Sequence, residues 1–98
     1  MKENLLKIIN HYGVMPQLKY FQSEVFELNE SIFEKEKIGA YPGVEEKEHI
    51  AEEIADVMVM LEQFRLYYDI SDMAVKDIMI NKIERQLERI NNEKDNNN

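Results

Sequence analysis

Two pairs of acidic residues carry the first chemistry that this sequence suggests. Glu24 and Glu27 stand three residues apart in one long segment, and Glu53 and Asp56 have the same spacing in another. At about 100° per residue, the members of each pair lie on one face of a helix. Carboxylate oxygens are the ligands that hard divalent cations prefer. The spacing therefore predicts a metal site built from two helices.

Both acidic pairs bear the same angular relation to an apolar stripe on their own segment. With the first acid of each pair at zero, the second falls near about −60°, whereas the apolar residues lie between about 20° and 120°. Antiparallel packing of the stripes would bring the pairs together at the edge of the seam. Two carboxylates 4 Å apart repel by about 4 kcal/mol at an effective dielectric of about 20. A cation bound between them makes the electrostatic energy of the cluster favourable. The stripes are Leu18, Phe21, Val25, Leu28 and Ile32, and Ile50, Ile54, Val57, Leu61 and Phe64.

The alternative for any single acidic pair is a solvated helix surface. The chain contains 20 Asp and Glu among 98 residues, so acidic pairs at this spacing are common, and charged residues are mostly exposed. The recurrence of two pairs in matching phase favours a site over two unrelated surface pairs.

Four helical segments position these residues. The apolar periodicity predicts helices over about 2–11, 16–37 and 45–68, and a fourth that begins after Ser71, a suitable N-cap. Gly13 and the segment 39–43, with two Gly and one Pro, separate them. The sequence thus predicts an all-α fold, a four-helix bundle in a single domain over 1–90, followed by a polar tail, 91–98, that is disordered.

Composition narrows the class of partner. The formal net charge of −8 excludes a nucleic-acid backbone as partner, because polyanion binding requires a basic face. There is no cysteine, no apolar run long enough to span a membrane and no signal-peptide pattern, so we expect a cytoplasmic protein without membrane association. A domain this short buries only about 60 to 65% of its unfolded surface. Self-association as a dimer or tetramer is therefore expected.

A two-part acidic motif gives the chain a family resemblance. Its residues are Gln17, the run from Ser23 to Leu28, the run from Glu52 to Val57, and the run from Leu61 to Gln63. They resemble the MazG-like branch of the all-α nucleoside triphosphate pyrophosphohydrolases, whose signature is EExxE, a variable spacer, and ExxD. The resemblance extends from about His11 to Ile90. Ser23 replaces the first Glu of EExxE.

The resemblance implies a MazG-like fold, a nucleotide substrate and a magnesium-dependent activity. A (d)NTP would be hydrolysed between its α- and β-phosphates to a monophosphate and pyrophosphate. Magnesium, with manganese as the alternative, would be held by the residues that match the family's ligands, Glu24, Glu27, Glu53 and Asp56. A carboxylate set without His or Cys suits such a hard cation. A metal-activated water then removes the need for a separate catalytic nucleophile.

Four further residues are candidates for substrate binding. The resemblance implies that Lys82 and Arg85 hold the phosphates and that Gln17 belongs to the site. Lys82 and Arg85 also share a helix face with Arg89, and an intrahelical ion-pair ladder with nearby glutamates explains that face equally well. Tyr20 lies on the acidic stripe and is a candidate to stack on a base, although packing is the commoner role of such a tyrosine.

Two other functions remain open. A di-iron carboxylate bundle also uses acidic helices but requires two Glu-x-x-His motifs, and this chain has only Glu46-x-x-His49. The second alternative is a non-enzymatic helical module that keeps the fold and acts as a regulator or assembly partner. The four carboxylates with Lys82 and Arg85 favour the enzyme.

Overall fold

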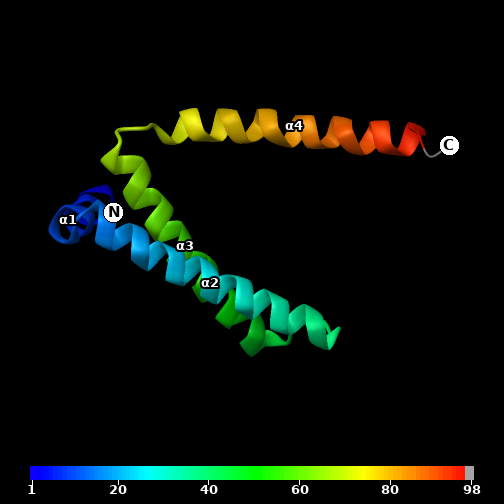
Figure 1. Ribbon diagram of the computed structural model, residues 1–98, viewed down its shortest axis with the longest axis horizontal. Coiled ribbons are helices and arrows are strands. Elements are labelled where there is room, and N and C mark those ends of the chain that lie inside the picture. The colour runs from blue at the N-terminus through cyan, green and yellow to red at the C-terminus, as the bar shows by residue number, and fades with distance from the viewer. Residues whose placement is uncertain (97–98) are drawn as a thin grey trace. The chain divides into compact units, whose positions relative to one another are not determined.

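The chain is helical throughout most of its length (Figure 1). A computed structural model describes residues 1–96, and within them four helices and no strand occur, which confirms the predicted all-α class. The helices are α1 (Lys2–Tyr12), α2 (Val14–Ile38), α3 (Val44–Tyr67) and α4 (Asp72–Asn96).

The helices fall into two compact units. Met1–Tyr68 contains α1, α2 and α3, and Asp69–Asn98 contains α4. The division follows the turn after α3, where Asp69 has a φ of 54°, in the left-handed region that Asp tolerates better than most residues. The acidic pairs therefore belong to the first unit, and the basic residues Lys82 and Arg85 belong to the second.

Helix boundaries follow the signals in the sequence closely. Gly13, with a φ of 91°, separates α1 from α2, and Gly39, with a φ of 77°, ends α2 in the left-handed conformation typical of a glycine C-cap. The Ser71 hydroxyl accepts a hydrogen bond from the backbone N–H of Ala74 at 3.0 Å, which confirms the predicted N-cap. The helix then continues through 91–96, in place of the predicted disordered tail, because no Gly or Pro interrupts it. Residues 97 and 98 lie outside the described part of the chain.

Helices α2 and α3 form an antiparallel hairpin (Figure 1). The ring centroids of Phe21 and Phe64 are 5.6 Å apart in an edge-to-face contact. Further along the hairpin, Lys35 on α2 forms an ion pair with Glu46 on α3. In these two contacts the residue number increases along α2 while it decreases along α3, as antiparallel packing requires. The two acidic pairs, near the middle of each helix, therefore meet.

The interior of the first unit lies where α1 packs against this hairpin. Its buried apolar side chains are Leu5 and Ile9 of α1 and Met60 of α3. The predicted apolar seam of the hairpin is confirmed only in part. Phe21 and Phe64 meet, but Val25 is 40% exposed and Leu61 is 49% exposed. The buried polar side chains of the unit are Gln17 and Glu24 of α2 and Gln63 of α3, so a polar edge of the hairpin lies in the interior.

Helix α4 buries none of its side chains. Isolated helices in water derive little stability from propensity alone and usually require an apolar face to be covered. None of the helices among the described residues has an apolar stretch that could cross a membrane.

Candidate metal centre

Three carboxylates from the two hairpin helices converge on one point. One oxygen each of Glu24, Glu27 and Glu53 lie within 4.8 Å of one another. Glu24 is buried, with 5% of its surface exposed, Glu53 is half-buried and Glu27 is exposed. The cluster is therefore closed toward the protein interior and open toward solvent on the Glu27 side.

The fourth predicted ligand, Asp56, adjoins the same cluster. Its carboxylate is close enough to Glu24 to share a hydrogen bond with it and to act on it through its charge. Asp56 is exposed and also contributes to the wall of a neighbouring groove. Three of the four acids that the sequence proposed as ligands thus converge, and Asp56 lies beside Glu24.

Burial and neighbouring charges make the ionised form of Glu24 costly. Its pKa is raised chiefly by desolvation, and the charges of Asp56 and Glu27 raise the pKa further. The hydroxyl of Tyr20 opposes these effects by a hydrogen bond to the carboxylate, and the pKa of Tyr20 is itself raised, first by that bond and then by the negative charge of Glu24. The cluster therefore attracts positive charge.

Two oxygens in this cluster lack a partner although they are buried. Oε2 of Glu24 and Oε2 of Glu53 accept no hydrogen bond among the described residues. An unsatisfied buried acceptor costs about 1 to 3 kcal/mol, and more when it is charged, so native proteins rarely leave such groups unpaired. A divalent cation would satisfy both oxygens and remove the repulsion between their carboxylates.

A groove of about 620 Å³ adjoins the acidic cluster on the α1 side of the hairpin. Two predicted substrate-binding residues, Gln17 and Tyr20, line it together with Asp56. Gln17 is buried, whereas Tyr20 is 56% exposed. The groove is lined by Ile8, Tyr12, Pro16, Gln17, Tyr20, Asp56, Val59, Met60 and Gln63.

The predicted phosphate-binding residues are on a separate part of the chain. Lys82 and Arg85 are exposed on α4 in the second unit. Their neighbour Arg89 donates a hydrogen bond at 3.4 Å to Gln86 on the same helix. Within the described residues, no ion pair joins Lys82, Arg85 or Arg89 to the glutamates of α4, so the alternative of an ion-pair ladder is not observed.

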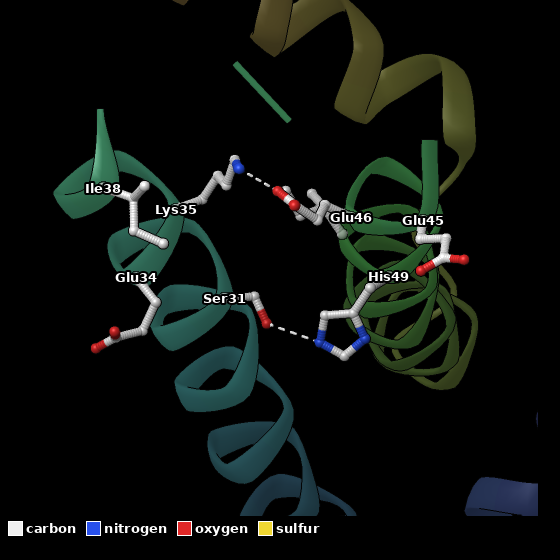
Figure 2. A pocket seen from close by; sticks show the side chains of 8 residues that line it. Ser31, Glu34, Lys35, Ile38, Glu45, Glu46 and His49 are labelled. Atoms are coloured by element: carbon white, nitrogen blue, oxygen red, sulfur yellow. Dashed lines mark hydrogen bonds and ion pairs between the residues drawn. The ribbon is translucent and has the colours of Figure 1, made fainter. Parts of the chain in front are cut away.

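A second polar contact joins α2 and α3 near the loop end of the hairpin, between Ser31 and His49 (Figure 2). Ser31 Oγ donates to the backbone carbonyl of Glu27 at 3.0 Å and lies 3.2 Å from Nε2 of His49. Because a hydroxyl has one hydrogen to donate, Nε2 of His49 is the donor to Ser31. The same nitrogen is 3.8 Å from Oε1 of Glu53. His49, which the sequence placed only in the single Glu-x-x-His motif, therefore borders a carboxylate of the cluster.

Ser31 and His49 also line a second hollow of about 490 Å³, near the loop between α2 and α3 (Figure 2). The ion pair between Lys35 and Glu46 crosses it. Glu46 belongs to the only Glu-x-x-His motif, and its carboxylate pairs with this lysine instead of turning toward the acidic cluster. The hollow is lined by Ser31, Glu34, Lys35, Ile38, Glu45, Glu46, His49 and Ile50.

Gln63 is the residue of this region whose role the sequence did not reveal. It is 2% exposed and accepts a hydrogen bond at 2.8 Å from Nε2 of Gln17. Its spacing offered a signal: Gln63 follows Asp56 by seven residues, and Gln17 precedes Glu24 by seven. Seven residues are about two helical turns, so each glutamine lies on the acidic face of its helix.

Comparisons with known proteins give no assignment. No family model matches the chain, and neither the curated proteins nor the solved structures include a significant match.

Proposed function

We propose that this protein is a metal-dependent nucleotide pyrophosphohydrolase of the MazG-like kind. Water would attack the α-phosphorus of a nucleoside triphosphate, the bond between that phosphorus and the bridging oxygen would break, and pyrophosphate would leave. Magnesium is the proposed cation, with manganese as the alternative.

The observation that carries the proposal is the pair of unpartnered buried oxygens on Glu24 and Glu53. They lie in a cluster whose carboxylates converge within 4.8 Å. An all-oxygen donor set with an open side fits magnesium, which retains water and binds substrate phosphates alongside one or two carboxylates. When bound, the cation supplies an acidified water and offsets charge on the phosphate oxygens.

The protein's own residues would contribute positioning. Tyr20 holds the Glu24 carboxylate through its hydroxyl, and His49 borders Glu53 from the other side. The groove lined by Gln17 and Tyr20 begins at Asp56, so a ligand in it would extend toward the acidic cluster. We further propose that Lys82 and Arg85 neutralise the substrate's phosphates.

Self-association is part of the proposal. The outer stripe of the α2–α3 hairpin is apolar yet half-exposed, with Ile32 at 43% and Ile54 at 42%. Burial of apolar surface stabilises by about 25 cal/mol per Å², and contiguous exposed apolar patches mark interaction surfaces. A second copy of the chain is the proposed cover for this stripe.

A non-enzymatic module is the competing function, and turnover separates the two. We would incubate the protein with a panel of nucleoside triphosphates and magnesium and measure pyrophosphate release, with Glu53→Gln and the exposed neighbour Glu52→Gln as matched variants. Release that Glu53→Gln abolishes and Glu52→Gln preserves is the expected result. Absence of release from every nucleotide would refute the enzymatic proposal.

A further inference from the structure

Helix α4 carries an apolar stripe that is exposed along its length. From Met73 to Ile90, positions three and four residues apart in alternation are apolar except at Lys76. This spacing is the heptad pattern of helices that pack against one another in a coiled coil. The α4 stripe consists of Met73, Ile80, Ile83, Leu87 and Ile90, which are 45% to 72% exposed.

The charged residues of α4 are sorted by sign onto the two edges of this stripe. With Ile83 at zero and about 100° per residue, the stripe and the apolar residues beside it cover about −80° to 80°. Acidic residues follow at about 100° to 140°, and basic residues lie at about −100° to −160°. The acidic edge is Asp77, Glu84 and Glu88, and the basic edge is Lys82, Arg85 and Arg89.

This sorting leaves both edges available to another helix. Opposite charges on one helix usually support each other when they are three or four residues apart on the same face. Among the described residues, no ion pair joins the acidic edge of α4 to its basic edge. A partner helix that presents both signs of charge would complement α4.

The distribution of charge over the chain selects that partner. Helix α4 holds five of the 12 Lys and Arg but only six of the 20 Asp and Glu, so it is nearly neutral in a chain of net charge −8. Most of the excess negative charge therefore lies outside α4. The α2–α3 hairpin of another copy would meet the acidic edge with like charge, whereas another α4 offers both signs.

The direction of packing follows from which edges meet. In a parallel pair related by a two-fold axis, the left edge of each helix faces the right edge of its partner, whereas in an antiparallel pair like edges meet. Parallel packing therefore sets acid against base on both sides of the seam. Antiparallel packing would set acid against acid and base against base.

We propose that α4 pairs in parallel with α4 of a second copy of this chain, apolar stripe against apolar stripe and acidic edge against basic edge. This interface goes beyond the proposed function and is distinct from the outer stripe of the hairpin. The rim of an interface stays accessible to solvent, so Lys82 and Arg85 remain open to a ligand.

Single cysteines in the full-length protein test the pairing, because the chain has no cysteine of its own. In parallel helices each residue faces its own copy, so Met73→Cys and Ile90→Cys should each form a disulfide-linked dimer under mild oxidation. Ile78→Cys is the matched control, since Ile78 is 55% exposed on α4 but lies at about −140°, outside the stripe. A disulfide requires Cα atoms about 4.4 to 6.8 Å apart, so each stripe variant should give about tenfold more linked dimer than the control.

The same variants expose the alternatives. Met73 and Ile90 are separated by about 26 Å along the helix, and antiparallel packing in register would place each opposite the other. Linked dimer that forms only when Met73→Cys and Ile90→Cys are mixed would overturn the parallel pairing. No linked dimer from either variant, or equal linking of Ile78→Cys, would overturn the interface itself.

Charge reversal provides a second arm on the Met73→Cys background. Lys82→Glu with Arg89→Glu makes both edges acidic and replaces attraction by repulsion. Because exposed ion pairs are individually weak, the linked fraction should fall only about fivefold. Glu84→Lys with Glu88→Lys makes both edges basic, and an equal mixture of the two proteins should restore linking.

A control for net charge completes this arm. Lys2→Glu with Lys7→Glu changes the same amount of charge on exposed residues of α1 and should leave the linked fraction as it was. An equal fall in this control and in Lys82→Glu with Arg89→Glu, or a mixture that fails to restore linking, would refute the edge complementarity. None of these measurements involves turnover, so the pairing and the hydrolase are tested separately.

Discussion

Replacement of Glu53 by glutamine tests the metal centre most directly. The Glu53 carboxylate lies within 4.8 Å of those of Glu24 and Glu27. At that separation and an effective dielectric of about 20, each pair of full charges repels by about 3 kcal/mol. Solvent screens the exposed Glu27, so we expect Glu53→Gln to stabilise the metal-free protein by about 1 to 2 kcal/mol.

The assay is thermal unfolding at neutral pH with and without magnesium, together with pyrophosphate release. One kcal/mol shifts the Tm of a domain of this size by about 4 to 8 °C, so Glu53→Gln should raise the metal-free Tm by about 4 to 16 °C. Magnesium at ten times its Kd should stabilise the wild type by about 1.4 kcal/mol and Glu53→Gln much less, and only the variant should lose turnover.

Glu52→Gln provides the control, because it removes an equal charge from an exposed neighbour on α3. It should change neither the magnesium response nor turnover. If Glu53→Gln and Glu52→Gln respond alike to magnesium and both retain activity, the carboxylates are not a metal centre and the reasoning fails.

Three further predictions concern charge and assembly. The pKa of Glu24 is raised in the folded protein, so the contribution of Glu24 to the stability of the metal-free protein should fall as the pH rises from the unfolded pKa of about 4.3 through the folded pKa. The free energy of unfolding in urea, measured against pH, should fall more steeply for the wild type than for Glu24→Gln. Parallel curves for the two proteins would contradict this prediction. Lys82→Ala should raise KM about 10- to 150-fold, the range for a hydrogen bond to a charged group, and Arg89→Ala should raise it less; equal, negligible effects would place the phosphate contacts elsewhere. Light scattering should show at least a dimer, which Ile54→Glu shifts toward monomer, and a stable wild-type monomer would refute self-association.

The sequence by itself determined the local architecture and pointed to the acidic residues that converge between α2 and α3. Helical periodicity and the glycines at positions 13 and 39 placed the helix boundaries, and the Ser71 cap fixed the start of α4. The matched spacing of the two acidic pairs predicted that they would meet, and they do. The helix boundaries and the cap depend on neighbours within two or three turns, which a single chain displays directly.

Tertiary packing decided which face of the hairpin became interior. The helical period gives the angle between the side chains of Glu24 and Val25. It does not predict which of the two another helix will cover. Packing of the first unit buried the acidic edge of α2, with Glu24 at 5% exposure, and left Val25 at 40%. The unpartnered carboxylate oxygens, the raised pKa of Glu24 and the Gln17–Gln63 bond all follow from that choice. Each depends on distances between residues remote in sequence, and those distances are set only when the helices pack.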